Sequence, residues 1–474
     1  MAPLNNKVVL VGFMGAGKTT IGQDAAERLG WEFEDVDQSI EVTDGPIDAI
    51  FATKGEEHFR KLEESYFASS LFVPSKKVIA LGGGAVETDV IRYELKQPEV
   101  TTVWLDIDVD TAWSRARNSS RPLAQDEGEF RERYARRREL YAEVADATAH
   151  DVDDVVLAAA GVHVERGALQ HLGDLVPGDG PVALVSDEHV AGIHGMDAQL
   201  ALGQRLASAH ELPRGEEAKT LTALDRLWQE LRLDRGGTIA ALGGGATTDA
   251  AGLAAALYLR GIPWVPVPTS LVGQVDAAIG GKTAIDIPQG KNLVGAFHWP
   301  ARTVIDPALL ETLPEAQRLE GLAEVVKTGL LAGEPLWDLP TDELVRRTAA
   351  FKAAVCLRDP HDHGERKILN LGHTFAHALE AAAAYEGVTH GQAVALGLLA
   401  ALRLSGKDIA QVEEILHPKP VRVDREKAWQ ALQRDKKIVG GELRLVLLGD
   451  DGPRFDVPVP AEDVRRELDA LIAG

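Results

Sequence analysis

The chain of 474 residues is long enough for two or three domains, and its hydrophobic content of 45% is ample for folded cores. A net charge of −23 argues against nucleic acid as a partner, and no apolar run reaches the length of about 18 residues that indicates a membrane span. One cysteine excludes an internal disulfide framework, and the first motif begins too early to leave room for a signal peptide, so we expect a cytoplasmic protein without nucleic-acid or membrane partners.

Residues 1–158 alternate short apolar runs with helical patterns, which predicts a parallel α/β domain. We expect its strands at 8–12, 78–81 and 102–105, and helices at 56–68, 131–138 and about 153–160.

A phosphate-binding loop follows the first of these strands. Residues 12–19, GFMGAGKT, match the pattern Gly-x-x-x-x-Gly-Lys-Ser/Thr between a strand and a helix. Glycines in this loop let backbone N–H groups surround a phosphate chain, while Lys18 can neutralise the transferred phosphoryl group and Thr19 can hold Mg²⁺. We therefore expect a site for ATP and Mg²⁺ at Gly15, Ala16, Gly17, Lys18, Thr19 and Thr20.

Two carboxylates, Asp35 and Asp37, follow an apolar and aromatic stretch. A kinase needs one carboxylate near the metal and one near the attacking hydroxyl, and an Asp-x-Asp pair at a strand end can supply both. The alternative is a solvated acidic turn, so the pair alone does not identify a phosphate acceptor.

Together, the motifs of this half resemble the shikimate kinase family. In that family's order and spacing stand GFMGAGKTTIG (12–22), FEDVDQSIE (33–41), FRKLEE (59–64), LGGGAV (81–86), RPL (121–123) and RRELY (137–141). The resemblance implies a P-loop, nucleoside-monophosphate-kinase-like fold that phosphorylates the 3-hydroxyl of shikimate.

The resemblance also implies roles for single residues. Asp37 would contact the attacking hydroxyl and Asp35 would hold a metal-bound water. Arg60 and Arg137 would pair with the shikimate carboxylate, a task suited to a planar bidentate donor, and the backbone of Gly83 would touch the acceptor.

Two further arginines would serve the nucleotide. The resemblance places Arg121 on a lid that reaches the ATP phosphates, and Arg115 or Arg117 against the adenine. The alternative for each arginine is a surface salt bridge, and the alternative for the whole half is a nucleotide-binding module without turnover.

A second series of strands and helices begins near residue 162. We expect strands at 182–186, 238–242 and 264–268, an α/β domain at 162–312 and a mostly helical domain at 313–474. Within the last domain the pattern predicts helices at 374–384 and 392–404 and a strand pair at 443–448 and 454–457. The sequence LGGGA occurs at 81–85 and again at 242–246, each time after a strand, and indicates two separate turns of close backbone approach.

A metal site is indicated by histidines in the last domain. His373 and His377 are four residues apart on one helix face, His390 precedes another helix, and Glu324 lies in an apolar segment. Two histidines and one carboxylate suit Zn²⁺ with open coordination positions. The sequence alone does not decide whether His377 or His390 is the second histidine ligand.

Nucleotide and anion chemistry are indicated less strongly. Gly243, Gly244 and Gly245 between a strand and a helix can admit a pyrophosphate, although they do not form the Gly-x-Gly-x-x-Gly pattern. Basic residues that could together hold a phosphorylated carboxylate are Arg260, Lys282, Lys291, Lys327, Lys352 and Arg366.

From about residue 162 to the end, the chain resembles the 3-dehydroquinate synthase family. The segments in that family's order are GEEAKT (215–220), LGGGATTD (242–249), YLRG (258–261), VPTSLVGQVDAAIGGKTAID (267–286), GKNLVGAF (290–297), AEVVK (323–327), ILNLGHTFAHALE (368–380) and HGQAVALG (390–397). The resemblance implies NAD⁺, a divalent metal (Zn²⁺ or Co²⁺), conversion of 3-deoxy-arabino-heptulosonate 7-phosphate to 3-dehydroquinate and phosphate, and a homodimer formed through this half.

By the same resemblance, the metal ligands would be Glu324, His373 and His390. The substrate site would contain Arg260 of a neighbouring subunit, Asp276, Lys282, Asn292, Lys327, Lys352, Arg366, Asn370, His377 and a lysine of the 435–437 segment, which we take as Lys436. Contacts to NAD⁺ would come from Asp187, Glu216, Lys219, Gly244, Gly245, Asp249, Thr269, Ser270, Lys282 and Lys291. The residues expected to take part in the two reactions themselves are Lys18, Asp37, Arg121, Lys282, Asn292, Lys327, Arg366 and His377.

The chain departs from the usual synthase pattern at a few positions, which are Arg214, Thr247, Thr248, His189, Asp362 and Ala376. None of them removes an expected ligand or base. The interpretation is therefore a bifunctional enzyme of aromatic precursor synthesis, with another sugar-phosphate cyclase or a polyol dehydrogenase as the alternative for the second half.

Overall fold

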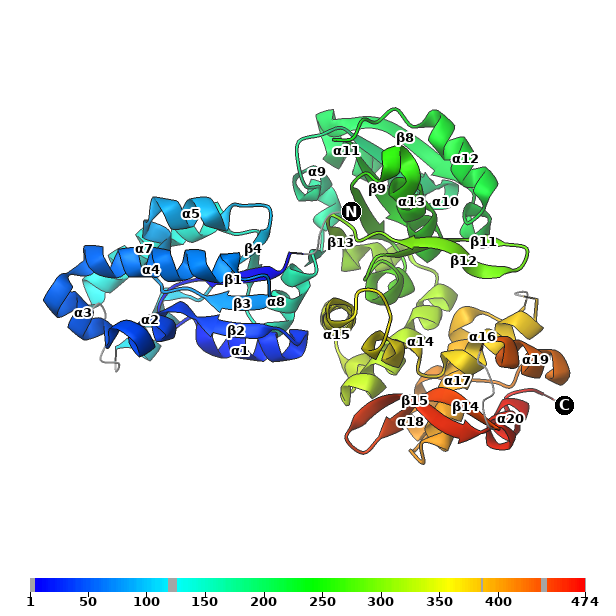
Figure 1. Cartoon of the computed structure of the whole chain (residues 1–474). Coiled ribbons are helices and arrows are strands. Elements are labelled where there is room, and N and C mark those ends of the chain that lie inside the picture. The colour runs from blue at the N-terminus through cyan, green and yellow to red at the C-terminus, as the bar shows by residue number, and fades with distance from the viewer. Residues whose placement is uncertain (1–4, 118–125, 385–386, 436–440, 474) are drawn as a thin grey trace. The chain divides into compact units, whose positions relative to one another are not determined.

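The computed structural model describes residues 5–117, 126–384, 387–435 and 441–473 (Figure 1). The chain divides into two compact units after Gly161, called the N-terminal and the C-terminal unit below. The further division expected near residue 312 lies within the C-terminal unit and stays a prediction.

Five parallel strands form the sheet of the N-terminal unit, in the order β2-β3-β1-β4-β5. The strands are β1 (Lys7–Val11), β2 (Glu32–Asp35), β3 (Lys77–Ala80), β4 (Val100–Leu105) and β5 (Ala147–Ala149). The central strand β1 is buried along its whole length, as expected where helices cover both faces of a parallel sheet. The strands predicted at 8–12, 78–81 and 102–105 are confirmed as β1, β3 and β4.

The edge strand β2 was not predicted as a strand, and its composition explains why. Its sequence EFED offers one apolar side chain among three acidic ones, and none of its residues is buried. It therefore lacks the apolar run by which the other strands are recognised.

The helices of the N-terminal unit follow the sequence pattern closely. They are α1 (Lys18–Leu29), α2 (Val36–Asp44), α3 (Ile47–Lys54), α4 (Glu56–Phe72), η1 (Ala85–Glu87), α5 (Asp89–Leu95), α6 (Val109–Ala116), α7 (Glu127–Val144) and α8 (Val152–Ala159). The helices predicted at 56–68, 131–138 and 153–160 are confirmed as α4, α7 and α8. Asp126 and Asp151 begin the last two, because each carboxylate accepts a hydrogen bond from a backbone N–H of the first turn.

A four-stranded parallel sheet of order β10-β9-β7-β8 forms the centre of the α/β part of the C-terminal unit. Three smaller pairs complete the strands, namely parallel β6 with β13 and the antiparallel hairpins β11–β12 and β14–β15. The strands are β6 (Val162–Val164), β7 (Val182–Asp187), β8 (Leu206–Leu212), β9 (Thr238–Gly243), β10 (Trp264–Pro268), β11 (Lys282–Ile287), β12 (Gly290–Phe297), β13 (Thr303–Ile305), β14 (Glu442–Gly449) and β15 (Gly452–Pro460).

Helices dominate after β13. Those of the C-terminal unit, with η marking 3₁₀ or π-helical turns, are η3 (Ala168–His171), α9 (Leu172–Leu175), α10 (Glu188–Val190), η4 (Ala191–Gly195), α11 (Met196–Leu202), η5 (Gly203–Arg205), η6 (Gly215–Ala218), α12 (Leu221–Glu230), α13 (Gly245–Leu257), η7 (Tyr258–Arg260), η8 (Gly273–Ala277), η9 (Pro307–Thr312), α14 (Glu315–Ala332), η10 (Leu336–Asp338), α15 (Thr341–Arg358), η11 (Glu365–Asn370), α16 (His373–Ala382), α17 (His390–Leu404), α18 (Ala410–Leu416), α19 (Arg425–Asp435) and α20 (Ala461–Ala470).

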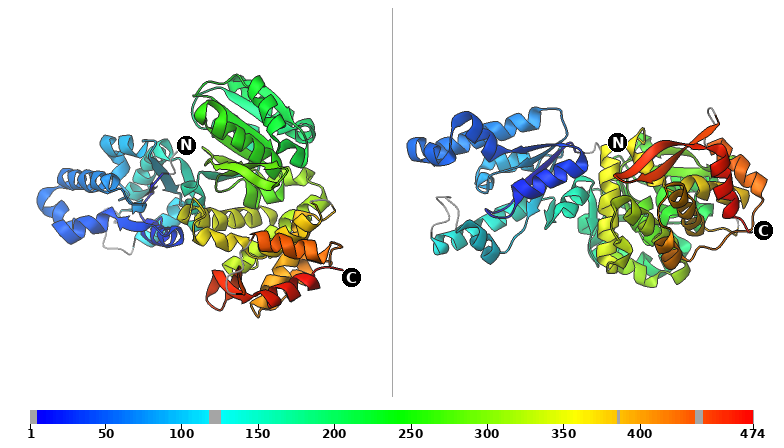
Figure 2. Two further views of the ribbon diagram at one scale, coloured as in Figure 1. Left: turned by 45° about the vertical axis from the view of Figure 1, so that its right-hand side comes forward. Right: turned by 90° about the horizontal axis from the view of Figure 1, so that it is seen from below.

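The predicted elements of this unit are confirmed, with a longer terminal hairpin than expected. Strands β7, β9 and β10 correspond to 182–186, 238–242 and 264–268, and helices α16 and α17 to 374–384 and 392–404. In both views of Figure 2 the β14–β15 hairpin lies beside α20, with which it is in contact. Among the described residues, no helix combines the length and the apolar composition needed to cross a membrane.

Candidate active sites

The N-terminal unit contains a cavity of about 740 Å³ at the carboxyl ends of its central strands. In parallel α/β sheets ligands bind at this edge. The wall includes Gly15, Gly17, Lys18, Thr19, Thr20, Asp35, Asp37, Arg60, Glu63, Gly83, Arg115 and Arg137. The structure thus brings the expected phosphate loop, both aspartates and the two expected carboxylate-binding arginines to one cavity.

The phosphate loop has the conformation that its glycines allow. Gly15 and Gly17 have φ angles of 84° and 88°, values that side-chain-bearing residues rarely adopt. Lys18 begins α1, and its Nζ donates to the carbonyl oxygens of Gly12 and Phe13 at 2.8 and 3.2 Å. The ammonium group therefore lies over the loop, where the phosphates of a nucleotide would bind.

Thr19 and Asp35 lie together at the metal end of this loop. The Thr19 hydroxyl donates to Asp35 Oδ2 at 2.6 Å. A hydroxyl and a carboxylate in contact are oxygen ligands of the kind that Mg²⁺ prefers, directly or through water. Thr19 and Asp35 therefore fit the Mg²⁺ ion that accompanies a nucleoside triphosphate.

At the acceptor end, each arginine is held by a carboxylate. Arg60 Nη1 pairs with Glu63 Oε2 at 2.7 Å, and Arg137 Nη2 pairs with Glu87 Oε2 at 2.8 Å. Arg137 is only 2% exposed, and its Nε has no hydrogen-bond partner among the described residues. A buried donor without a partner is costly, and a bound carboxylate would supply the missing acceptor.

Glu63 and Glu87 were missed in the sequence, although Glu63 follows Arg60 at the helical spacing of three residues. Glu63 is fully buried, and burial raises its pKa to about 7, against the opposing effect of Arg60. Glu87 behaves in the opposite way: burial would raise its pKa, but Arg137 and Arg136 lower it below the ordinary value.

The glycines of the LGGGA turn at 81–85 leave room for the side chains of Asp37 and Arg60. A methyl group added at Gly82 would come within 2.8 Å of Asp37 Oδ1, and one at Gly84 within 2.7 Å of Arg60 Cζ. The Gly83 carbonyl accepts a hydrogen bond from Tyr141 at 2.5 Å. The close approach predicted at this turn is confirmed, and the groups that approach the backbone are side chains that line the cavity.

Of the three arginines considered for contacts to the nucleotide, Arg115 lies beside the phosphate loop. Arg115 Nη1 donates to the Gly15 carbonyl at 2.9 Å. It also lines a second cavity of about 620 Å³ with Thr20, Ile107 and His150. Arg117 is exposed, and Arg121 lies outside the described residues.

In the C-terminal unit, Glu324, His373 and His390 come together from α14, α16 and α17. One ligand atom of each lies within 4.8 Å of the others, with Glu324 Oε1 at 3.1 Å from His390 Nε2 and 3.4 Å from His373 Nε2. His390 Nδ1 lies 3.3 Å from Glu380 Oε1, and His373 Nδ1 lies 3.2 Å from the Leu371 carbonyl. Oxygen partners on the outer nitrogens orient both rings, a common arrangement around zinc.

His377 is not part of this group of three. It is exposed, and its ring centroid lies 5.6 Å from that of His373. Of the two histidines that the sequence left open, the geometry therefore favours His390 as the second ligand. The donor set of two imidazoles and one nearly fully buried carboxylate fits a zinc-type ion.

The charges around this group favour an ionised Glu324 beside nearby cations. Burial would raise the pKa of Glu324, but Lys327 and His373 hold it well below its ordinary value. Burial would lower the pKa of His390, but hydrogen bonds to Glu324 and Glu380 raise it to about 10.

A buried basic cluster adjoins the three residues. Lys327 pairs with Glu324 and lies 3.8 Å from Asp276 Oδ1, while Lys352 lies 2.7 Å from the same oxygen. Burial would raise the pKa of Asp276, but the two lysines lower it. Two buried ammonium groups beside a metal-type site can hold a phosphorylated carboxylate.

The other expected substrate residues occupy different places. Arg366 is buried against Gly280, Lys282 pairs with Asp362 Oδ2 at 2.5 Å, and Asn370 is half-buried at the end of η11. Arg260 is exposed, with a φ of 68°, and no ion pair of Arg260 occurs within the described part of the chain. Lys436 lies outside the described residues.

The expected nucleotide contacts form a separate network around Lys219. Its Nζ pairs with Asp249 Oδ2 at 2.9 Å and contacts the Asn292 side chain, and Lys291 pairs with Glu216 at 3.1 Å. Asn292, expected with Lys282 and His377, is thus placed by its contacts in this network. Burial raises the pKa of Asp249 to about 6, against the effect of Lys219.

Four of the remaining residues expected to contact the nucleotide line a smaller cavity of about 150 Å³. Its wall includes Asp187, Gly244, Thr269 and Ser270. It also includes three residues at which the chain departs from the usual synthase pattern, namely His189, Arg214 and Thr247. Thr247 donates to Asp187 Oδ2 at 3.2 Å, so this departure gives the aspartate a partner. Gly245 lies where an added methyl group would meet Ala277 at 3.2 Å.

Comparisons with known proteins agree with this division. Residues 14–162 match the family model of shikimate kinase, and 209–320 and 321–438 match those of the 3-dehydroquinate synthase N-terminal and C-terminal domains. A 3-dehydroquinate synthase of Bordetella pertussis is 38% identical over 355 residues, covering 67% of this chain and 99% of the relative. A crystal structure of 2-deoxy-scyllo-inosose synthase complexed with carbaglucose-6-phosphate, NAD⁺ and Co²⁺ matches with a TM-score of 0.59 at 25% identity, over 65% of this chain and 96% of its own.

One relative spans both units. A bifunctional shikimate kinase/3-dehydroquinate synthase of Thermotoga maritima is 34% identical over 489 residues, covering 94% of this chain and 96% of the relative. The chain therefore belongs to the family of bifunctional enzymes that join a shikimate kinase to a 3-dehydroquinate synthase.

Proposed function

We propose that the N-terminal unit phosphorylates the 3-hydroxyl of shikimate with ATP and Mg²⁺, and that the C-terminal unit converts 3-deoxy-arabino-heptulosonate 7-phosphate to 3-dehydroquinate and phosphate with NAD⁺ and Zn²⁺ or Co²⁺. Family membership supports both activities. The roles of single residues rest on the contacts described above.

In the N-terminal unit, the supporting observation is that phosphate-binding and carboxylate-binding groups share one cavity. Lys18 and the loop N–H groups hold the ATP phosphates, and Thr19 with Asp35 holds Mg²⁺. Arg60 and Arg137 hold the shikimate carboxylate, which orients the 3-hydroxyl toward Asp37. Asp37 accepts the proton of that hydroxyl or orients it during transfer.

In the C-terminal unit, the supporting observation is the contact between the Glu324–His373–His390 group and buried Lys327. Glu324, His373 and His390 would hold the metal, which would supply Lewis-acid chemistry at the alcohol to be oxidised, and the network around Lys219 would help to hold NAD⁺, which would supply the hydride acceptor. Lys327, Lys352 and Arg366 neutralise the anionic groups of the substrate. His377, exposed beside His373, is suited to proton exchange with the solvent and the leaving phosphate.

One assay on the full chain tests the second reaction against its alternatives. We would follow phosphate release from the heptulosonate phosphate with NAD⁺ and Zn²⁺, with and without a chelator, while recording NADH absorbance. A cyclase releases phosphate without net NADH, and the chelator stops it. Steady NADH formation would instead indicate a dehydrogenase, and ATP binding without shikimate-dependent ADP formation would indicate a non-catalytic N-terminal unit.

We further propose that the C-terminal unit forms a homodimer in the cytoplasm, with Arg260 reaching the substrate phosphate of the partner. The exposed position of Arg260 supports this assignment. A monomer in sedimentation at the concentration of the activity assay would contradict it.

Substituting Gly84 with alanine is expected to raise the KM for shikimate roughly 10-fold to 100-fold, with a smaller change in the KM for ATP. The added methyl group would come within 2.7 Å of Arg60 Cζ, and Arg60 cannot yield freely because Glu56 and Glu63 hold it. Steady-state kinetics with each substrate varied measures the effect, and the synthase activity of the same chain is the control. An unchanged KM for shikimate would remove Arg60 from the acceptor site.

The stability of the N-terminal unit is expected to depend on pH through Glu63. Because its folded pKa is raised from 4.5 to about 7, the folded unit binds a proton that the unfolded chain releases in this range. Stability is thus fully present below pH 4.5 and is lost as the pH rises through about 7, by an amount on the order of 3 kcal/mol. Hydrogen exchange in urea, read separately for this unit, should show the loss in the wild type and not in Glu63→Gln. Equal pH dependence of the two proteins would contradict the assignment.

A further inference from the structure

A second group of metal-ligating side chains lies outside both active sites. Within the described ranges, two groups of three His, Cys, Asp or Glu residues bring one ligand atom of each within 4.8 Å of the others. One is Glu324, His373 and His390. The other consists of His163, Glu165 and His171, at the start of the C-terminal unit, and neither reaction uses it.

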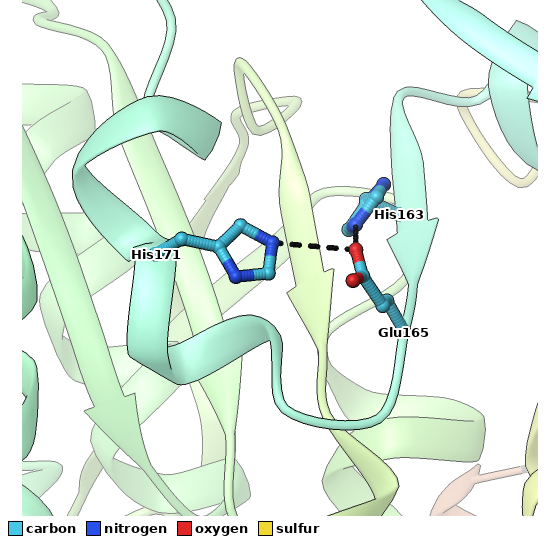
Figure 3. Close-up of side chains that lie close together, drawn as sticks. All are labelled: His163, Glu165 and His171. Atoms are coloured by element: carbon cyan, nitrogen blue, oxygen red, sulfur yellow. Dashed lines mark hydrogen bonds and ion pairs between the residues drawn. The ribbon is translucent and has the colours of Figure 1, made fainter.

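The three side chains meet because of the local fold. His163 and Glu165 stand two residues apart on β6 and the residue after it, so the strand directs them to the same side. The chain then turns at Gly167, with a φ of 90°, and His171 ends the following helical turn η3. Figure 3 shows His171 facing the strand, with both imidazole rings directed at the same carboxylate oxygen.

The backbone that carries these residues is fixed on both sides of the turn. Strand β6 pairs with β13, and the Glu165 N–H donates to the Ile305 carbonyl at 3.0 Å. Asp306 accepts from the N–H groups of Gly167 and Leu169 at 2.8 and 3.1 Å. The backbone positions that carry the three side chains are thus set by the fold and do not depend on a ligand, which lowers the cost of binding one.

The distances are close to those of a metal site. Glu165 Oε2 lies 2.8 Å from His163 Nε2 and 3.3 Å from His171 Nε2. Ligand atoms of a tetrahedral zinc, bound at 2.0–2.1 Å, are about 3.3 Å apart, so small rotations of half-exposed side chains suffice. The side chains are 33%, 47% and 38% exposed, which leaves a coordination position for water.

We propose that His163, Glu165 and His171 bind a divalent transition metal, in the first place Zn²⁺, which ties strand β6 to the η3 turn. Two imidazoles and one carboxylate are ligands that zinc accepts in this number, with water completing the coordination. The role is structural, because the site adjoins none of the substrate or nucleotide residues described above. A bound metal stabilises the folded C-terminal unit by an amount that grows with the logarithm of the metal concentration relative to its dissociation constant.

The test counts metal on the full chain. Wild-type protein is stripped with a chelator, titrated with Zn²⁺, and its bound metal is measured by elemental analysis after removal of free ion. We expect two zinc ions per chain in the wild type and one in His171→Gln and in Glu165→Gln. His417→Asn, which replaces an exposed histidine outside both groups, is the matched control and keeps two.

Further variants separate this site from the catalytic one. His390→Ala should lose the other ion and the synthase activity, whereas His171→Gln should keep the synthase activity and lose only part of the rise in Tm that Zn²⁺ produces. One zinc ion per wild-type chain, or two in His171→Gln, would overturn the proposal. The absorption of bound Co²⁺ gives an independent count, because each of the two sites should contribute its own spectrum.

Discussion

Replacing Lys18 with alanine is expected to lower shikimate-dependent ADP formation by roughly 10²-fold to 10³-fold or more, because one preorganised charge at the transferred phosphoryl group is lost. Lys18 Nζ lies over the phosphate loop, where it donates to the carbonyl oxygens of Gly12 and Phe13. The methyl group of alanine can make neither these contacts nor an interaction with phosphate. A coupled assay of ADP formation at saturating ATP and shikimate measures the loss in kcat.

The same variant shows whether the two units work independently. Synthase activity should be unchanged, because Lys18 belongs to a unit that folds around its own sheet and core. Lys54→Ala, which replaces an exposed lysine at the end of α3, is the matched control and should keep both activities. Loss of the synthase activity in Lys18→Ala would mean that the units are coupled, and full kinase activity would remove Lys18 from the mechanism.

The sequence was most informative where chemistry and backbone conformation depend on the same few residues. The glycines and Lys18 of the phosphate loop are contiguous, so one short pattern predicts the strand, the turn and the start of α1. The same holds for the LGGGA turn before η1, whose second and fourth residues lie against side chains of the site. Such local signals require no knowledge of how distant segments pack.

Residues joined only by packing could not be predicted in the same way. Glu87 pairs with Arg137, which lines the N-terminal cavity, and no local pattern links two residues that are 50 positions apart. Asn292 lies beside Lys219 because the β11–β12 hairpin brings it there, with a φ of 57° at this position. Alternation of apolar residues predicts strands, but it carries no information about the partner of a polar side chain at a hairpin.

The choice between His377 and His390 as a metal ligand shows the same limit within a single site. Helical periodicity correctly places His373 and His377 on one face of α16, where their rings are 5.6 Å apart. Whether a third ligand lies near one or the other depends on how α14 and α17 cross that helix. In the structure Glu324 and the first residue of α17 meet beside His373, and this geometry favours His390 over His377 as the second histidine ligand.

Replacing His390 with alanine is expected to remove the metal of the synthase site and to lower phosphate release by about 100-fold or more. Substitution of a residue that only supports a metal ligand already lowers metal affinity or activity by about 10-fold to 100-fold, and His390 is itself an expected ligand. His390 Nε2 lies 3.1 Å from Glu324 Oε1, and Glu380 orients the ring from its other nitrogen.

His377→Ala is the matched comparison: we expect it to keep the metal and to lose activity, because His377 is exposed beside His373 and is proposed to move protons. Metal content and phosphate release, measured on the same samples, distinguish the two roles. If His377→Ala lost the ion beside Glu324 while His390→Ala kept it, the assignment of the ligands would be reversed, and if both variants kept the full metal content of the wild type, the ion would lie elsewhere. Excess Zn²⁺ sharpens the comparison, because it should restore part of the activity to a variant that has only lost affinity and none to one that has lost a proton carrier.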